Sequence, residues 1–188
     1  GSIRFPNKVL KKIGKKTVIE MIVDRISKSK NIDNLVVATT DKSIDKKLRK
    51  FLRDKNINVF LGSEKNVLDR FYKAAKLFSP KYVVRICGDC PFVDSKLLDE
   101  MIKKIKAKNY DYVSNINPPT YPDGFDMEIF TFMSLKNAFK KSNSNYEKEH
   151  VTPYIVKNTK NSYNLETKDG YSNIRLTLDE PLDLNVLK

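Results

Sequence analysis

Short apolar runs alternate with amphipathic segments through the first two thirds of the chain, and this order constrains the fold more than any other feature. Buried strands are expected at 35–39, 59–61, 82–86 and 112–114, and helices at 17–29, 43–55, 67–78 and 95–108. Continuous apolar strands separated by helices are typical of a parallel sheet covered on both faces. Right-handed crossovers then bring the carboxyl ends of the strands to one edge, where open α/β sheets bind ligands. The pattern predicts an α/β fold with mostly parallel strands.

The remaining third is less regular. We expect a turn-rich loop at 118–124, strands at 127–130, 163–166 and 174–178, helices at 134–141 and 146–158, and the opening of a helix at 181–188. No internal repeat, linker or low-complexity tract divides the 188 residues, a length that can bury a core. We therefore expect one domain, residues 1–188.

The formal net charge is +13, from 36 Lys and Arg against 23 Asp and Glu. Such charge suits a nucleic-acid-binding module. It also suits a solvated surface or the attraction of a polyanionic small substrate. The paired lysines 46–47, 103–104 and 140–141 lie on separate expected helices and form no single basic arm, so we do not expect a nucleic-acid partner.

No apolar run approaches the ~20 residues of a membrane helix and no signal-peptide core is visible, so we expect a cytoplasmic protein without a membrane partner.

The two cysteines, Cys87 and Cys90, are too few for a structural zinc site when the chain has one histidine. A redox Cys-x-x-Cys pair normally opens a helix, whereas this one follows a strand. We expect two reduced thiols without a catalytic role.

Asp89 follows the expected strand 82–86 directly, between Gly88, which permits a sharp turn, and Pro91. A carboxylate there suits Mg²⁺, which proteins bind through one or two carboxylates together with substrate phosphates. Capping of a turn explains Asp89 equally well from this segment alone. Asp179 has the same placement after the expected strand 174–178, although Asp179 and Asp183 also suit helix capping. The pair of aspartates favours a metal–phosphate site.

Arg4 and Lys8 add two cations near the N-terminus that suit a polyphosphate, although basic N-termini are usually only solvated.

With these segments in view, the chain resembles the cytidylyltransferases of the spore-coat polysaccharide (SpsF-like) group and, more distantly, CMP-KDO synthetase and the acylneuraminate cytidylyltransferases. The family opens with Arg-x-Gly-Ser-x-Arg-Leu-Pro-Gly-Lys-Val-Leu, which residues 1–10 match from Gly-Ser onward. Collinear matches follow at 37–41, 62–63 with 67–71, 85–91, 123–128, 149–154 and 174–179. Each motif is weak alone, but together they span nearly the whole chain in order.

The resemblance implies a Rossmann-like, glycosyltransferase-A-type sheet that transfers CMP from CTP to a sugar acid and releases pyrophosphate for surface polysaccharide biosynthesis. It implies Mg²⁺ as cofactor, and we expect a homodimer.

By the resemblance, the catalytic residues are Arg4, Lys8 and Asp89, and the metal ligands are Asp89 and Asp179. The nucleotide-binding residues are Ser2, Arg4, Lys8, Ala38, Thr39, Arg70 and Arg85. The sugar-binding residues are Asp123, Asp126, Glu128, Glu149 and His150. Outside this motif, His150 would be interpreted as an ordinary helix histidine. Another nucleotide, or a sugar phosphate as acceptor, is the alternative within enzymes.

The chain departs from the family at three points. Asn7 stands where the phosphate loop usually has Gly, and Lys148 where Arg often precedes Glu-His. The sequence also begins inside the first family motif and ends about one turn into a helix. We therefore expect residues 1–188 to lack the family's first strand and to be truncated at both ends, and this stretch alone to fold poorly or to be weakly active.

Overall fold

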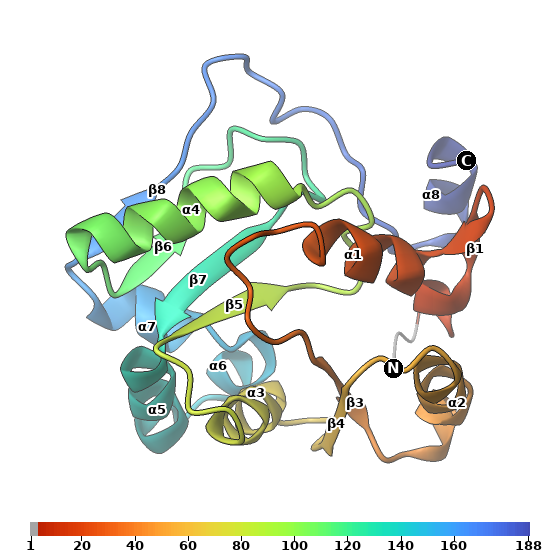
Figure 1. The fold of residues 1–188 in the computed structure, drawn as a ribbon, viewed down its shortest axis with the longest axis horizontal. Helices are drawn as coiled ribbons and strands as arrows, with labels where there is room; N and C mark the ends of the chain where they lie inside the picture. The colour runs from red at the N-terminus through yellow and green to blue at the C-terminus, as the bar shows by residue number, and fades with distance from the viewer. Residues whose placement is uncertain (1–3) are drawn as a thin grey trace.

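The computed structural model describes residues 4–188 and has the expected α/β class (Figure 1). The strands are β1 (Lys12–Ile13), β2 (Lys16–Thr17), β3 (Val37–Thr40), β4 (Val59–Gly62), β5 (Tyr82–Ile86), β6 (Tyr112–Ser114), β7 (Met127–Thr131) and β8 (Ser162–Asn164). The helices are α1 (Val18–Ile26), α2 (Lys46–Asp54), α3 (Val67–Lys76), α4 (Ser95–Lys108), α5 (Phe132–Lys141), α6 (Asn145–His150), α7 (Pro153–Asn158) and α8 (Pro181–Val186). Two 3₁₀ turns, η1 (Lys8–Leu10) and η2 (Ser43–Asp45), complete the elements of this part of the chain.

The strands pair in a mixed pattern. The largest sheet has the order β5-β7-β6-β8, in which β6 and β8 are parallel and β7 is antiparallel to both of its neighbours. The antiparallel strand has a simple cause: no helix lies between β6 and β7, and a parallel pairing needs a crossover connection. The strands β3 and β4 form a separate parallel pair, joined by α2 as the crossover.

Helices cover both faces of the largest sheet (Figure 1). Alternation along β7 separates the two packing layers, since successive residues of a strand point to opposite faces. Met127 and Ile129 pack in the core shared with α1 and α4, whereas Phe130 packs in a second core with α3, α5 and α7. The helix α3 also contacts β3 and β4, so it lies against both sheets.

The helix expected at 146–158 is two helices in the structure. Val151, between α6 and α7, has φ 71° and ψ −56°, and the Thr152 N–H donates to the carbonyl of His150 at 2.8 Å. This is a γ-turn with positive φ, which costs of order 1–3 kcal/mol for a branched side chain. Complete burial of the Val151 side chain opposes that cost. Pro153 is the first residue of α7, because proline is accommodated in the first turn of a helix, where its missing N–H would have no helical partner.

The strand expected at 174–178 is also different in the structure. This segment forms one isolated parallel bridge, between Arg175 and Asp123. The Asp123 N–H donates to the carbonyl of Ile174 at 2.9 Å, and the Leu176 N–H donates to the carbonyl of Asp123 at 2.7 Å. The segment therefore ties the loop before β7 to the end of the chain that carries Asp179.

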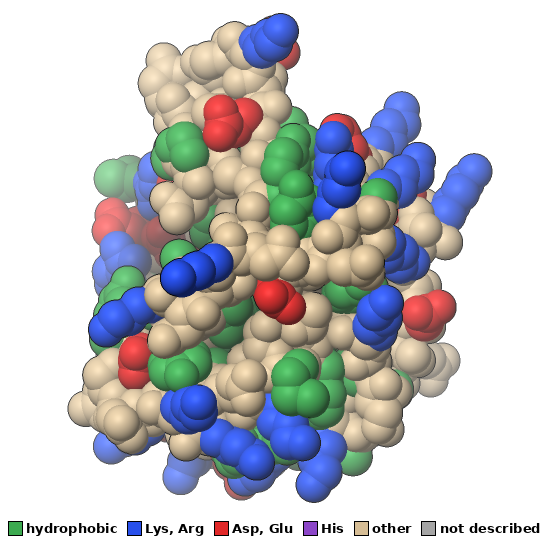
Figure 2. Space-filling view, turned by 90° about the vertical axis from the view of Figure 1, so that its left-hand side faces the viewer, with side chains coloured by type: hydrophobic (Ala, Val, Ile, Leu, Met, Phe, Trp, Pro, Cys, Tyr) green, Lys and Arg blue, Asp and Glu red, His purple; other side chains and the backbone are tan. Residues whose placement is uncertain are grey.

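Basic side chains are distributed over the surface. Figure 2 shows one face of the molecule, over which Lys and Arg side chains are spread among acidic and hydrophobic ones, with a denser group along its lower edge. Among residues 4–188, no helix is long and apolar enough to cross a membrane.

Candidate active site

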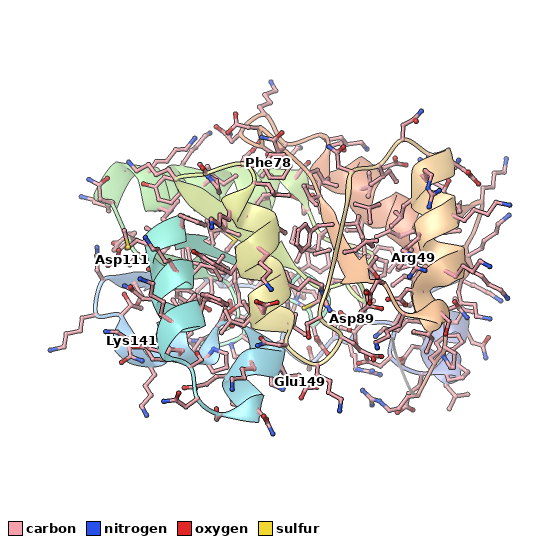
Figure 3. The ribbon with its side chains drawn as sticks, turned by 90° about the horizontal axis from the view of Figure 1, so that it is seen from below. Arg49, Phe78, Asp89, Asp111, Lys141 and Glu149 are labelled. Carbon is pink, nitrogen blue, oxygen red and sulfur yellow. The ribbon has the colours of Figure 1, made fainter. Side chains whose placement is uncertain are left out.

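Lys8 joins the two aspartates that the sequence singles out. Its Nζ atom lies 2.9 Å from Oδ2 of Asp89 and 2.9 Å from Oδ1 of Asp179. The three residues come from η1, from the loop after β5 and from the segment before α8, which are far apart in the sequence. Figure 3 shows Asp89 near the middle of the molecule, between α3 and α2. The arrangement therefore brings two carboxylates and one cation together beyond the carboxyl end of β5, an edge strand of the largest sheet.

Close backbone packing allows this meeting. A Cβ atom on Gly88 would lie 3.2 Å from Cγ1 of Val9, so a glycine lets η1 approach the loop that carries Asp89. Asn7, at the start of η1, has φ 57° and ψ 26°, the left-handed conformation that Gly adopts freely and Asn tolerates better than most residues. The departure from Gly is therefore accommodated. On the opposite side, the Leu178 N–H donates to the carbonyl of Asp89 at 2.9 Å.

The charges of Lys8 and Asp179 stabilise each other. Burial alone lowers the pKa of Lys8, but the negative charge of Asp89 and hydrogen bonds to Asp179 and Asp89 outweigh it and leave this pKa above its ordinary value. Burial likewise opposes ionisation of Asp179, but hydrogen bonds from Lys8 and Arg175 leave its pKa lowered. Lys8 is therefore an ammonium ion and Asp179 a carboxylate at neutral pH.

The two aspartates fit the donor set of a magnesium site. Both direct a carboxylate oxygen at one shared cation, the Lys8 ammonium, and Mg²⁺ prefers such hard oxygen ligands. Within the described residues, no group of three or more His, Cys, Asp and Glu side chains has the geometry of a metal site. Two protein carboxylates leave room for phosphate oxygens and water, which Mg²⁺ usually retains.

Arg4 lies beside the same cluster. Its side chain is two-thirds exposed, and its guanidinium is 3.7 Å from Asp179 and 3.3 Å from Glu180. An exposed Arg with these partners is free to exchange them for a phosphate. Ser2, which the family resemblance assigns to the nucleotide, lies outside the described residues.

A pocket of about 490 Å³ lies at the carboxyl ends of β3 and β4 and is lined by Asp41, Lys42, Gly62, Ser63, Glu64 and Lys65. Arg70, from α3, reaches toward this edge, and its Nη1 donates to the carbonyl of Ser63 at 2.5 Å. Its Nε is buried without a hydrogen-bond partner in the part of the chain that the structure describes. Thr39, at the end of β3, donates its hydroxyl to Asp45 at 2.7 Å, and Ala38 precedes it on the strand. Ala38, Thr39 and Arg70 belong to the strand and the helix beside this pocket but are not among its lining residues, and their nucleotide-binding role stays a prediction.

Arg85 and Glu128 form a buried ion pair across β5 and β7. The two residues are register partners, and Nη1 of Arg85 lies 2.5 Å from Oε2 of Glu128, whose side chain is 3% exposed. Tyr112 on β6 donates its hydroxyl to Oε1 of Glu128 at 2.7 Å. Both oxygens of Glu128 thus have protein partners, although the resemblance assigns Glu128 to the sugar and Arg85 to the nucleotide. Those two roles stay predictions, and the pair supports the strand end that leads to Asp89.

Asp123 and Asp126 lie on the loop before β7. Burial raises the pKa of Asp126 to about 6, with further contributions from the charges of Asp123, Asp89 and Glu128. These charge interactions indicate that Asp123, Asp126 and Glu128, three of the expected sugar-binding residues, lie in the same region as Asp89.

The pKa of Asp126 predicts a pH-dependent gain from Asp126→Asn. Because this pKa, about 6, is above the 3.8 of the unfolded chain, the folded state binds the proton more tightly. Its contribution to stability therefore falls as pH rises from about 4 to about 6. After allowance for solvent screening, we expect Asp126→Asn to raise the free energy of unfolding by about 1 kcal/mol at pH 7.5, with little change at pH 4. Urea unfolding at both pH values measures this, and an equal gain at both would contradict it.

Gly124 holds the same loop close to the segment before Asp179. It has φ 109°, and an added Cβ atom would lie 2.8 Å from the carbonyl carbon and oxygen of Leu176. We expect Gly124→Ala to lower the free energy of unfolding by about 2 kcal/mol or more, because it combines a disfavoured backbone conformation with a backbone collision. Gly170→Ala is the matched control: φ is 66° there, and an added Cβ meets nothing within 4 Å. Equal losses in urea unfolding for the two variants would refute the role of the close approach.

Glu149 and His150 end α6, and both side chains are exposed. Figure 3 shows Glu149 nearer the lower edge of the view than Asp89. The His150 ring lies 4.6 Å from that of Tyr146. No hydrogen bond or ion pair identified in residues 4–188 joins Glu149 or His150 to the Lys8 cluster, so their assignment to the sugar stays a prediction.

The two cysteines are free thiols, as expected. Burial raises the pKa of Cys87 to about 11 and raises the pKa of Cys90 as well, with a further contribution from the charge of Asp89. Thiolates, the reactive form, are therefore scarce at neutral pH.

Sequence reasoning missed two side chains that organise the site, Tyr112 and Arg175, and the ion pair between Arg175 and Asp183, whereas the helix-capping role expected for Asp183 is confirmed. Arg175 lies four residues before Asp179, within a motif that the family resemblance includes. That spacing gave no signal by itself, because the segment was expected to be a strand, in which residues four apart do not touch.

Comparison with known proteins gives similarity along the whole chain. A family model described as cytidylyltransferase matches residues 1–182. An uncharacterised protein of Methanocaldococcus jannaschii is 40% identical over 190 residues, which are 99% of this chain and 77% of that protein. The spore coat polysaccharide biosynthesis protein SpsF of Bacillus subtilis is 33% identical over 200 residues, with 100% and 81% covered.

Two solved structures superpose on the whole of this chain. A cytidylyltransferase from Leptospira borgpetersenii superposes with a TM-score of 0.94 at 33% identity, over 100% of this chain and 81% of that one. A CMP:2-keto-3-deoxy-manno-octonic acid synthetase complexed with CTP superposes with a TM-score of 0.74 at 14% identity, over 100% and 92%. At that identity the second likeness concerns the fold alone, and it agrees with the Rossmann-like architecture expected from the sequence.

Proposed function

Because this chain belongs to the cytidylyltransferase family, and is therefore a nucleotidyltransferase, we propose that it transfers CMP from CTP to a sugar acid and releases pyrophosphate. One observation carries the proposal for the site: a single ammonium, that of Lys8, lies 2.9 Å from a carboxylate oxygen of Asp89 and of Asp179. A cluster of two carboxylates and neighbouring cations is what phosphoryl-type transfer requires, because such transfer depends on positioning and on charge stabilisation.

The acceptor class and the pathway are inferred from relatives. The Bacillus subtilis relative is a spore coat polysaccharide biosynthesis protein, which supports a role in surface polysaccharide biosynthesis. A 3-deoxy-manno-octulosonate cytidylyltransferase of Hydrogenovibrio crunogenus is 33% identical over 141 residues, which are 73% of this chain, and this relative supports a sugar acid as acceptor. The carboxylates at Asp123 and Asp126 suit hydrogen bonds to sugar hydroxyls.

In the proposed reaction, a hydroxyl oxygen of the acceptor attacks the α-phosphorus of CTP in line with the departing pyrophosphate. The bond from the α-phosphorus to the bridging oxygen breaks, the electron pair leaves with pyrophosphate, and the hydroxyl proton is released. Arg4 and Lys8 bind the phosphates, and Lys8 counters the charge that grows on the leaving oxygens. Asp89 and Asp179 would hold Mg²⁺, which supplies Lewis-acid stabilisation of the phosphate charge.

A pyrophosphate-release assay tests the proposal. The protein is incubated with Mg²⁺, with each of the four nucleoside triphosphates and with a panel of sugar acids and sugar 1-phosphates. We expect release that requires CTP, a sugar acid and Mg²⁺ together. Release with another nucleotide or only with a sugar phosphate would replace the proposal with a different sugar nucleotidyltransferase. No release, combined with salt-sensitive nucleic-acid binding that survives Asp89→Asn, would indicate a binding module instead.

A further inference from the structure

The guanidinium of Arg175 contacts three carboxylates. Its Nη1 lies 2.5 Å from Oδ1 of Asp183, and its Nη2 lies 3.1 Å from Oδ2 of the same residue. The same Nη2 lies 3.2 Å from Oδ2 of Asp179, and Nε lies 3.7 Å from Asp123. One side chain thus joins the proposed metal carboxylate, the start of α8 and the loop before β7.

Asp183 holds Arg175 in a fixed orientation. Its Oδ2 accepts the N–H groups of Asp179 at 2.7 Å and Glu180 at 2.8 Å, and its side chain is 13% exposed. The two bonds between Asp183 and Arg175 form the planar, two-point pair that fixes a guanidinium in direction as well as position. Asp183 therefore fixes the Arg175 guanidinium independently of its contact with Asp179.

The anchored Arg175 determines which way Asp179 points. Oδ2 of Asp179 accepts from Arg175, whereas Oδ1 accepts from Lys8, which also contacts Asp89. With one oxygen held on the Arg175 side, the other is directed at the cation position that Asp179 shares with Asp89. Partners that orient a metal ligand in this way commonly change metal affinity 10–100-fold when they are removed.

Arg175 is also tied to the loop that carries Asp123. The backbone of Asp123 exchanges hydrogen bonds with Ile174 and Leu176, on either side of Arg175. The Thr177 hydroxyl reaches the same Asp123 carboxylate, to Oδ2, at 3.5 Å. The position of this loop is therefore transmitted to Arg175 through both the backbone and the side chain.

We propose that Arg175 is a positioning residue that orients Asp179 toward the cation position shared with Asp89 and couples that position to the loop at Asp123. The inference rests on the proposed function, since it takes Asp89 and Asp179 as the metal ligands. It assigns Arg175 no contact with the reacting atoms. The Arg175 side chain is about half exposed, and partly exposed ion pairs add little to stability, so its loss is expected to change metal binding more than folding.

Metal binding without substrate tests this inference. Mn²⁺ serves as the probe, and the free ion is measured by electron paramagnetic resonance in a titration of the protein without nucleotide. We expect Arg175→Ala to weaken Mn²⁺ binding about 10-fold and to raise the Mg²⁺ concentration for half-maximal pyrophosphate release by a similar factor. Arg175→Lys should recover only part of the loss, because Lys is a point charge and lacks the planar fork. Arg53→Ala, which removes an exposed Arg from α2, is the matched control and should leave both values unchanged.

The outcomes separate this inference from the proposed function. Wild-type Mn²⁺ affinity in Arg175→Ala, in a protein that still releases pyrophosphate from CTP, would overturn the positioning role and leave the function standing. Complete rescue by Arg175→Lys would also overturn it, because the fork would then be unnecessary. A wild-type protein that neither binds Mn²⁺ nor uses CTP would overturn the proposed function, and the inference with it. Urea unfolding of each variant shows whether a loss of binding reflects a loss of folding.

Discussion

Asp89→Asn is expected to lower the rate of CTP-dependent pyrophosphate release by about 10³-fold. The substitution keeps the shape of the side chain but removes its charge, and a neutral amide is a poor ligand for Mg²⁺ beside triphosphate oxygens. A thousandfold loss corresponds to about 4 kcal/mol of transition-state stabilisation, at about 1.4 kcal/mol for each decade. The loss should appear mainly in kcat, because charge on the phosphates grows in the transition state.

The control for this variant is Asp33→Asn, which removes one negative charge from an exposed position before β3. It should keep the wild-type rate, so that a general effect of net charge is separated from the loss of the carboxylate at Asp89. Steady-state pyrophosphate release measures both, and urea unfolding confirms that both variants are folded. Wild-type-like turnover in Asp89→Asn would remove Asp89 from the catalytic site.

Glu128→Ala is expected to cost about 3–5 kcal/mol in the free energy of unfolding, the largest effect on stability that we predict. The substitution leaves Arg85 charged and mostly buried without its carboxylate, and it leaves the Tyr112 hydroxyl without its acceptor. Most of this cost arises from the unpaired charge and hydroxyl left behind, since the net contribution of the intact pair is small.

A double variant distinguishes this account from a simple loss of packing. Arg85→Met with Glu128→Leu replaces the whole pair by apolar side chains of similar size and should recover the part of the stability loss that the unpaired Arg85 charge causes, while the Tyr112 hydroxyl still lacks its acceptor. Urea unfolding of the single and double variants gives the comparison. If the double variant is as unstable as the single one, the unpaired charge is not the cause. In a separate measurement, the rate of pyrophosphate release by the double variant shows whether the ion pair also affects catalysis.

Much of the first half of the fold could be predicted because local signals agree with the final structure. The strands 82–86 and 112–114 and the helix 95–108 have the expected bounds. The side chain of Asp94 caps the start of that helix by accepting from two backbone N–H groups, and Asn109 ends it in a left-handed conformation. These residue types favour those positions by themselves, so no tertiary information was required.

The differences arise where distant contacts override the local pattern. The apolar pattern of 146–158 runs through Val151 without a break, although its positive φ depends on the buried packing of that side chain; Pro153 was the available signal. The segment 174–178 has strand-like residues, but its described partners are single positions on Asp123 and Asp89. Glu128 faces Arg85 because of the register of β5 and β7, which one sequence does not reveal. The cluster of Lys8, Asp89 and Asp179 was easier to anticipate, because strand ends and family motifs both mark it.

The burial of the two thiols gives the protein a practical property. With the pKa of Cys87 at about 11, roughly one thiol in a thousand is ionised at pH 8, and burial also raises the pKa of Cys90. Maleimide reagents react with the ionised, accessible form, so both native sulfurs should react slowly with them. A cysteine introduced at the exposed Ser172 should then accept a fluorophore selectively, without removal of any native residue. That label would show whether the environment of the segment that precedes Asp179 changes when CTP is added.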